Sequence, residues 1–454
     1  MTYDLVIQNG NVITSTSIAQ ADVAVLDGKI AEIAPGLSGR ERISADGMLV
    51  IPGGVDPHVH IQMPVANTAT SDHWETSSRA AALGGTTSVI DFVETERPDQ
   101  LLLDAFHARL GLAHGKSWID FAFHMTLSSG DAVVLGQVPG VVEAGMPSFK
   151  LYTTYDGFRL SDIDLLHAFQ AIAKAGGLAL VHTESDTIVS DAIRQLRTAG
   201  KLSVADFPQS RPAIAEKEAI ERVLSLANFA QTPVYIVHVS TQAGAAAIAR
   251  SRSGGQKAWG ETCPQYLLLN DALIKTADSS GAKFICCPPL RTLVDNQALW
   301  NALKHGDLQT VGTDHCSFNV CGQKDQGQNS FLEIPPGLTG IELRLALLYT
   351  YGVKTGRMSL QQWVAACCTA PAQIFGLFPR KGDLLPGADA DLVIFNPDLD
   401  ISISRSLLHE EVDYTPYEGL RLAGLPRTVL LRGQVLVRDR VWVGGSIRGE
   451  YLKC

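Results

Sequence analysis

Apolar and polar residues alternate in short segments at both ends of the chain. Near the N-terminus such segments begin at Leu5, Ala21 and Met48, around asparagine-glycine and aspartate-glycine pairs that favour tight turns. Segments that begin at Ala390 and Thr428 repeat the pattern near the C-terminus. Because so few strands do not form a stable sheet alone, we expect both ends to pair in one small β-sandwich domain. It would consist of residues 1–52 and 386–454.

The region between these ends, residues 53–385, alternates short apolar runs with helix-like stretches. Eight runs have the length and composition of buried strands, at residues 55–60, 86–92, 121–127, 148–152, 178–183, 234–239, 258–261 and 310–314. Intervening stretches predict helices, among them residues 74–83, 162–174, 213–229 and 243–250. Eight strands with helical crossovers predict an α/β fold, a parallel (β/α)8 TIM barrel. A doubly wound open sheet is the alternative, but its glycine fingerprint for dinucleotides is missing.

Metal-binding residue types stand at the ends of these predicted strands. His58 and His60 are two positions apart on the first strand, so they point to the same side. His182 ends the fifth strand, His238 the sixth and Asp314 the eighth. The C-terminal ends of barrel strands form the face where barrel enzymes carry their catalysts. Imidazole and carboxylate bind zinc and neighbouring metals, and this set exceeds what one tetrahedral ion needs. We therefore expect two divalent metal ions, with zinc favoured.

Lys150, on the fourth predicted strand, joins this set at the same end of the barrel. Two ions need a bridging ligand, and a protonated lysine has only hydrogen-bond donors. Reaction with carbon dioxide would convert Lys150 to an anionic carbamate with two oxygens. A lone lysine on a strand is usually a rim residue, and a lone histidine after an apolar run is usually a core residue. The shared placement of all six residues at one barrel end argues against both explanations.

The remaining histidines show no such pattern, and we expect them at the surface or in supporting positions. They are His73, His107, His114, His124, His167, His305, His315 and His409. Among them His315, next to Asp314, is favoured as a residue that supports the metal ligands.

Composition narrows the possible functions. The 454-residue chain has a formal net charge of −10 and no basic cluster, which argues against a nucleic-acid partner. No apolar run is long enough to span a membrane, and no secretory signal is apparent, so the cytoplasm is the expected location. Eight cysteines occur without a Cys-x-x-Cys motif, which argues against a disulfide framework and a structural zinc site.

Several motifs along the chain resemble one known family, the dihydropyrimidinases and D-hydantoinases, which are cyclic amidohydrolases of the amidohydrolase superfamily. The resemblance covers essentially the whole chain. It rests on residues 53–60, 148–155, 179–184, 237–240, 260–267, 288–291, 312–317 and 412–419.

The resemblance implies two metal sites that share one ligand. The first ion would be held by His58, His60, carbamylated Lys150 and Asp314, and the second by Lys150, His182 and His238. It also implies the β-sandwich at the chain ends and a homotetramer or homodimer.

The resemblance further implies which residues contact a small cyclic ureide substrate. Tyr155 matches the family tyrosine that stabilises the tetrahedral intermediate. Cys287 and Thr339 match positions that contact the ureide edge, largely through backbone atoms. They depart from the usual serine and asparagine, so the shape of the pocket is expected to differ. Residues 61–65 and Tyr152 match the pocket for the ring substituent.

The expected reaction is hydrolysis of the ring amide bond of dihydropyrimidines or 5-monosubstituted hydantoins, which gives N-carbamoyl amino acids. The ions would activate water, Tyr155 would donate to the oxyanion, and Asp314 would pass a proton to the leaving nitrogen. An allantoinase or imidase with the same metals is the nearest alternative. A non-catalytic relative is disfavoured by the complete ligand set, and an oxidoreductase has no supporting motif.

Overall fold

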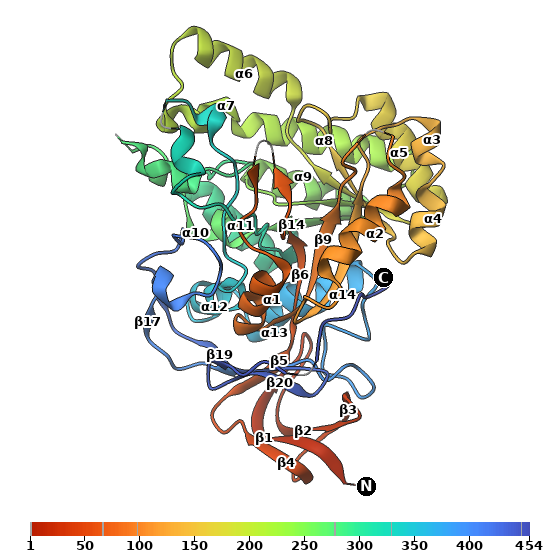
Figure 1. Cartoon of the computed structure of the whole chain (residues 1–454), viewed down its shortest axis with the longest axis vertical. Helices are drawn as coiled ribbons and strands as arrows, with labels where there is room; N and C mark the ends of the chain where they lie inside the picture. The colour runs from red at the N-terminus through yellow and green to blue at the C-terminus, as the bar shows by residue number, and fades with distance from the viewer. Residues whose placement is uncertain (1, 66–67, 98, 277, 328, 446) are drawn as a thin grey trace.

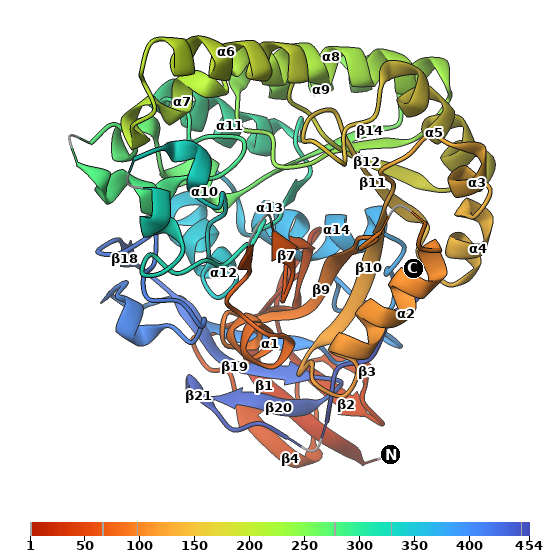
Figure 2. The same ribbon diagram turned by 45° about the horizontal axis from the view of Figure 1, so that its top comes forward.

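Eight parallel β-strands form the centre of the structure, a computed structural model that describes residues 2–65, 68–97, 99–276, 278–327, 329–445 and 447–454. Neighbouring strands follow chain order, as expected for repeated strand–helix units. The strands are β6 (Gly54–Val59), β9 (Thr86–Val93), β10 (Asp120–Thr126), β11 (Ser148–Tyr152), β12 (Leu178–His182), β13 (Val234–Ile236), β14 (Ala258–Thr262) and β15 (Thr310–Val311). Figure 1 shows helices outside this sheet, and Figure 2 shows the same arrangement tilted forward.

The last strand returns to the first, which closes the barrel. His315 and Val59 form a parallel bridge. The amide of His60 donates to the carbonyl of His315 at 2.8 Å, and the amide of Asp314 donates to the carbonyl of His58 at 2.9 Å. The predicted barrel is confirmed, and its seam is formed by the segments that carry three of the predicted ligands.

Strands β13 and β15 are shorter than predicted. The backbone leaves the extended conformation at His238, where φ is 40°, and at Asp314, where φ is 51°. Both residues therefore lie in loops just beyond the strands, and their side chains still belong to the C-terminal face of the barrel.

Helices cover the barrel between consecutive strands. Helices α1 (Trp74–Leu83), α5 (Asp162–Lys174) and α8 (Ala213–Phe229) have the predicted bounds, and α9 (Gln242–Ser253) is longer than predicted. The α9 N-terminus is fixed by Thr241, whose hydroxyl accepts from an amide of the first turn. The other α-helices are α2 (Leu102–Ala113), α3 (Ala132–Leu135), α4 (Val138–Glu143), α6 (Asp186–Thr198), α7 (Phe207–Ser210), α10 (Pro264–Leu268), α11 (Leu293–His305), α12 (Arg344–Leu348), α13 (Leu360–Val364) and α14 (Ala370–Ile374).

Strands from both chain ends form a second sheet below the barrel in Figure 1. Its nine strands are β1 (Tyr3–Ile13), β2 (Ile18–Leu26), β3 (Lys29–Ala34), β4 (Gly39–Ser44), β5 (Leu49–Pro52), β16 (Leu392–Asn396), β19 (Leu425–Leu431), β20 (Gln434–Arg438) and β21 (Val441–Trp442). The two ends meet where β5 pairs with β16, which confirms the predicted pairing. All nine strands belong to one sheet, in the order β21-β20-β19-β16-β5-β1-β2-β3. Strand β4 also pairs with β1, so β1 has β2 on one edge and both β4 and β5 on the other.

The C-terminal residues leave this sheet and return to the barrel. Leu452 donates its amide to the carbonyl of Phe121 at 2.7 Å, and Cys454 donates to the carbonyl of Gly145 at 3.0 Å. Two short pairs of strands complete the list, β7 (Pro64–Val65) with β8 (Thr68–Ala69) and β17 (Ile401–Ser402) with β18 (Arg421–Leu422). Within the described ranges, no helix has both the length and the apolar character needed to cross a membrane.

Candidate metal centre and substrate cavity

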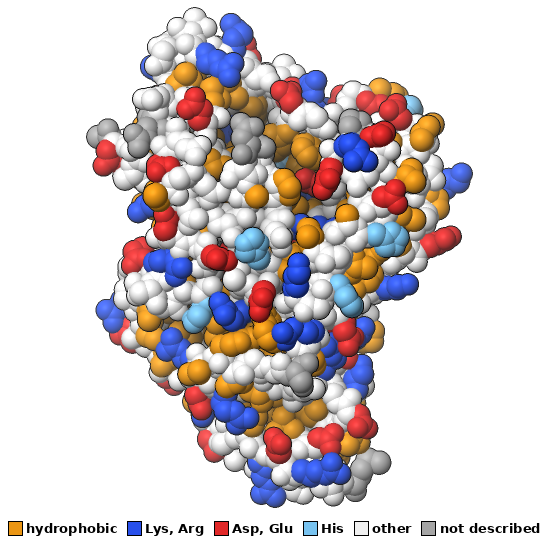
Figure 3. Space-filling model, viewed as in Figure 1, with side chains coloured by type: hydrophobic (Ala, Val, Ile, Leu, Met, Phe, Trp, Pro, Cys, Tyr) orange, Lys and Arg blue, Asp and Glu red, His pale blue; other side chains and the backbone are white. Residues whose placement is uncertain are grey.

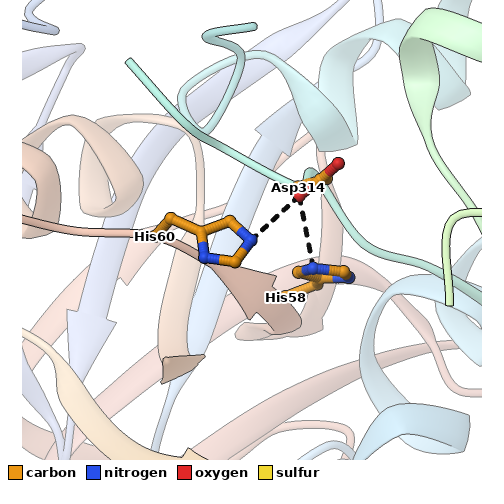
Figure 4. Close-up of side chains that lie close together, drawn as sticks. All are labelled: His58, His60 and Asp314. Carbon is orange, nitrogen blue, oxygen red and sulfur yellow. Dashed lines mark hydrogen bonds and ion pairs between the residues drawn. The ribbon is translucent and has the colours of Figure 1, made fainter. Parts of the chain in front are cut away.

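His58, His60 and Asp314 converge at the seam of the barrel (Figure 4). Oδ1 of Asp314 lies 3.2 Å from Nε2 of His58 and 3.1 Å from Nε2 of His60. Their ligand atoms lie within 4.8 Å of one another. The buried Nε2 of His58 has no hydrogen-bond partner among the described residues. Two imidazoles and a carboxylate whose ligand atoms converge in this way fit a divalent metal ion.

His182 and His238 form a second group beside the first. Nδ1 of His182 lies 2.9 Å from Nε2 of His238. The rings of His58 and His238 have their centroids 5.5 Å apart, so the two groups are adjacent. Burial lowers the pKa of His182 and His238, which favours the neutral imidazole that binds metal ions.

Lys150 is buried beside both groups. Its Nζ lies 4.9 Å from the ring centroid of Phe92 and 5.3 Å from that of Tyr152. Among the residues that the structure describes, Nζ accepts and donates no hydrogen bond. Burial lowers the pKa of Lys150 to about 8. Burial also lowers the pKa of His58 and His238, and the charge of Lys150 adds to that lowering. The structure thus places the predicted lysine within electrostatic reach of both groups of histidines.

Three site residues have backbone conformations that are uncommon outside glycine. The φ angles are 79° at Tyr155, 40° at His238 and 51° at Asp314. Such conformations cost free energy and are concentrated at functional sites, where the surrounding structure holds them in place.

A cavity of about 430 Å³ opens over these side chains. Tyr152, Tyr155 and Cys287 line it as predicted, as do Met63 and Val65 of the predicted pocket segment. The full lining consists of His58, His60, Met63, Pro64, Val65, Glu94, Lys150, Tyr152, Tyr155, Asp156, Phe158, His182, His238, Cys286, Cys287, Asp314, Cys316, Pro336 and Gly337. All six predicted metal ligands therefore face one cavity.

Comparison with known proteins identifies the family. A model of the amidohydrolase family matches residues 49–436. The chain belongs to the amidohydrolase family. This amidohydrolase is 42% identical over 453 residues to a D-hydantoinase of Geobacillus stearothermophilus, covering 98% of this chain and 96% of the relative.

Solved structures agree with this assignment. The amidohydrolase matches the crystal structure of a dihydropyrimidinase from Brevibacillus agri with a TM-score of 0.97 and 38% identity, covering 99% of this chain and 98% of that one. It matches an L-hydantoinase (dihydropyrimidinase) from Arthrobacter aurescens with a TM-score of 0.91 and 31% identity, covering all of both chains. The resemblance to dihydropyrimidinases and D-hydantoinases is confirmed, and the amidohydrolase family is metal-dependent.

Glu261 contacts two candidate metal ligands, His58 and His238, although the strand-end pattern did not single it out. One carboxylate oxygen lies 2.7 Å from Nδ1 of His58 and accepts from the amide of His238 at 3.1 Å. The other accepts from the hydroxyl of Tyr235 at 2.9 Å. Burial raises the pKa of Glu261 to about 7. Glu261 lies in one of the family motifs, but its contacts join different strands and cannot be read from spacing.

Glu184 and Arg211 form a second supporting pair that the sequence did not indicate. Glu184 Oε2 lies 2.9 Å from Nε2 of His182 and accepts from Arg211 at 2.5 Å. The guanidinium of Arg211 lies 5.0 Å from the ring centroid of Tyr155. Burial raises the pKa of Glu184, but Arg211 and His182 lower it more, to about 2. One ion pair therefore contacts both a metal-ligand candidate and the predicted oxyanion donor.

Other predicted residues lie around this centre rather than in it. Thr339 is buried and donates its hydroxyl to Glu410, and it is not among the residues lining the cavity. His315 lies 3.0 Å from Asp72 and accepts from the amide of Gly340 at 3.3 Å; neither partner is a predicted metal ligand, so its supporting role stays a prediction. The buried His124, by contrast, is within the barrel, with Nδ1 2.6 Å from a serine hydroxyl of β11.

Proposed function

We propose that this amidohydrolase opens the ring amide bond of dihydropyrimidines or 5-monosubstituted hydantoins and releases N-carbamoyl amino acids. The observation that carries the proposal is the convergence of the six predicted ligands on one cavity that also contains Tyr155. Relatives named D-hydantoinase and dihydropyrimidinase, which align over nearly the whole chain, support the same reaction. A cavity of about 430 Å³ is large enough for one small ring with a substituent.

The proposed cofactor is a pair of divalent ions, zinc being favoured by the imidazole-rich ligand set. His58, His60 and Asp314 would hold one ion, and His182 and His238 the other. Lys150 would contribute to both as a carbamate, formed when its neutral amine nitrogen bonds to the carbon of carbon dioxide and loses a proton. The buried amine beside both groups of histidines supports this role. When bound, such ions supply Lewis acidity, which activates water and polarises a carbonyl.

The chain's own side chains would handle the proton and the oxyanion. Burial raises the pKa of Tyr155, so its hydroxyl stays protonated and can donate to the developing oxyanion. Burial also raises the pKa of Asp314, but His58 and His60 lower it more, so the carboxylate is ionised and can accept a proton. Asp314 would take that proton from the attacking water and deliver it to the ring nitrogen as the amide bond breaks.

The presence of Cys287 in the cavity lining favours the alternative function, that of another cyclic amidohydrolase such as an allantoinase or imidase. This cysteine lines the cavity where the related family usually has serine. Thr339 supports the alternative function less strongly, because its hydroxyl donates a hydrogen bond to Glu410.

A side-by-side measurement of kcat/KM on a panel of rings distinguishes these activities. The panel contains dihydrouracil, 5-substituted hydantoins, allantoin, dihydroorotate and succinimide. We expect dihydrouracil or a hydantoin to be preferred. If allantoin, dihydroorotate or succinimide is preferred by more than about tenfold, roughly 1.4 kcal/mol of transition-state stabilisation, the substrate assignment is wrong.

Two further features stay predictions. We propose that residues 53–385 form the catalytic domain, with residues 1–52 and 386–454 forming the second domain. We also propose a homotetramer or homodimer, which light scattering of the purified protein would measure.

A further inference from the structure

Two acidic side chains in the substrate cavity have no role in the proposed reaction. Among the described residues, the charged side chains that line the cavity outside the metal-ligand set are Glu94 and Asp156. Glu94 is partly buried and directly follows β9, whereas Asp156 is exposed. Arg159, three residues after Asp156, pairs with Asp186 at 2.6 Å and does not line the cavity.

Glu94 has no partner in the described part of the chain. Its carboxylate makes neither an ion pair nor a hydrogen bond there. Arg109, the nearest buried arginine, is paired with Asp91 and also donates to the carbonyls of Ile61 and Gln62. Burial raises the pKa of Glu94, and the charges of His60, Arg109 and Lys150 lower it by less. A carboxylate in this environment is stabilised by any cation that enters the cavity.

The position of Glu94 is on the side of the cavity predicted to hold the ring substituent. Glu94 lines the cavity together with Tyr152 and with Met63 and Val65 of the segment predicted to hold the ring substituent. Tyr155, on the predicted oxyanion side, has the guanidinium of Arg211 5.0 Å from its ring centroid. The group that fits a metal ion consists of His58, His60 and Asp314 and does not include Glu94. The charge of His60 influences Glu94, but the carboxylate is outside that group and lines the cavity, where it can contact a substrate.

The charge of the cavity lining differs from that of the one face drawn in Figure 3. Over the face drawn in Figure 3, acidic and basic side chains are interspersed. Inside the cavity, the lining contains no arginine, and its one lysine is Lys150, which becomes anionic if it is carbamylated. In a partly enclosed site, charges interact more strongly than they do in bulk water, so at short range the carboxylate of Glu94 attracts a cationic group even though the proposed metal ions would lie in the same cavity.

We propose that Glu94 is a specificity-determining residue, which makes the enzyme prefer cyclic ureides whose ring substituent ends in a cation, an ammonium or guanidinium group. The carboxylate accepts a charge-assisted hydrogen bond from that group, and Asp156 adds to the field at the mouth of the cavity. The same charges disfavour substituents that end in a carboxylate. This inference rests on the proposed hydrolysis of hydantoins or dihydropyrimidines.

The test compares three hydantoins that differ in the substituent at the 5-position. They carry 4-aminobutyl, n-pentyl and 2-carboxyethyl groups, and kcat/KM is measured for each with the metal-loaded enzyme. The wild-type enzyme should prefer aminobutyl over pentyl by about tenfold or more, because charge-assisted hydrogen bonds are among the stronger ones. The carboxyethyl compound should be the poorest. In Glu94→Gln the aminobutyl preference should fall at least several-fold, and in Glu94→Leu it should reverse.

Matched controls distinguish recognition of the ring substituent by Glu94 from a general effect of its charge on the metal site. Glu96→Gln, an exposed glutamate two positions further along the same loop, should leave the ratio of aminobutyl to pentyl unchanged. The wild-type ratio should also shrink as salt is added, because the interaction is electrostatic. An unchanged ratio in Glu94→Gln overturns the inference. So does an equal loss on all three hydantoins, which would mean that Glu94 only balances the charge of the ions. If none of the three is hydrolysed, the proposed function itself fails and the inference fails with it.

Discussion

The carboxylate of Glu261 fixes the orientation of the imidazole of His58. Because Nδ1 of His58 lies 2.7 Å from Glu261, Nε2 is the nitrogen that faces His60 and Asp314. A carboxylate behind a ligating histidine holds the ring in place and increases its basicity. The orientation of His58, a candidate metal ligand, therefore depends on Glu261, which does not itself line the cavity.

Replacing Glu261 by glutamine should weaken metal binding by about 10–100-fold, the usual effect of removing such a partner. The amide keeps the shape but loses the negative charge. Metal affinity is measured by competition with a chromophoric chelator. Tyr235→Phe is the matched control, because it removes only the hydroxyl that donates to the other carboxylate oxygen. Equal affinities in wild type and Glu261→Gln would contradict the orienting role.

The convergence of the six proposed metal ligands on one cavity could be predicted from sequence, whereas the residues that contact them could not. Each of these residues is at or next to the end of an apolar run. Because the C-terminal ends of parallel barrel strands meet on one face, assigning the runs to successive strands predicts that these side chains converge. Glu184 and Arg211 are 27 positions apart, and the pattern of apolar residues between them does not predict that their side chains meet. Glu94 could have been predicted more easily than Glu184 or Arg211, although it was not singled out. It directly follows the second strand, so the reasoning used for the ligands would have indicated it.

Among the elements, the helix that begins at Arg344 holds the barrel seam together. The buried guanidinium of Arg344 donates to the carbonyl of Val55 in β6 and to that of Val311 in β15, both at 3.0 Å. It also lies 3.7 Å from Asp56, whose carboxylate accepts from Thr313 just before Asp314. The α12 N-terminus thus ties the first strand to the last, directly beneath the proposed metal site.

Arg344→Met should lower the free energy of unfolding by about 3–5 kcal/mol, because it leaves a buried carboxylate unpaired. Urea unfolding followed by circular dichroism measures the change. Arg197→Met in α6, an exposed arginine, is the control and should change stability by less than about 0.5 kcal/mol. If both variants unfold at the same urea concentration, Arg344 does not hold the seam.

Strand lengths were the least predictable part of the elements. The predicted strands continue past Ile236 and Val311, to residues 239 and 314. The chain instead turns into positive φ at His238 and Asp314. This turn directs both side chains into the cavity, and a pattern of apolar residues carries no information about it.

In the whole molecule, the barrel and the terminal sheet are joined by the buried amine of Lys381. It lies 2.5 Å from Asp120 of β10 and 2.8 Å and 2.9 Å from Asp391 and Asp389, which precede β16. Burial raises the pKa of Asp389, but Lys381 and its other donors lower it more, so the net shift is strongly downward. Burial lowers the pKa of Lys381, but the three carboxylates raise it more.

These shifts define the pH range in which the cluster stabilises the fold. Asp389 contributes above its unfolded pKa of about 3.9, and Lys381 contributes fully below its unfolded pKa of about 10.4. Lys381→Met should therefore destabilise the protein most near neutral pH, by about 3–5 kcal/mol. The loss should become smaller toward pH 4, as the unpaired carboxylates become protonated. Urea unfolding at several pH values measures it, with the exposed Lys201→Met as control. A loss independent of pH would contradict the ionic role of Lys381.

The measurement that tests the central claim most directly is metal content and turnover on the same sample. Protein stripped with a chelator is titrated with zinc in the presence of bicarbonate, and hydrolysis of a 5-substituted hydantoin is followed. We expect no turnover without metal, a rise that is complete near two ions per chain, and a product that is an N-carbamoyl amino acid. Lys150→Ala should bind less metal and recover little activity. Full turnover by the metal-free protein, or normal metal content and turnover in Lys150→Ala, would contradict the account.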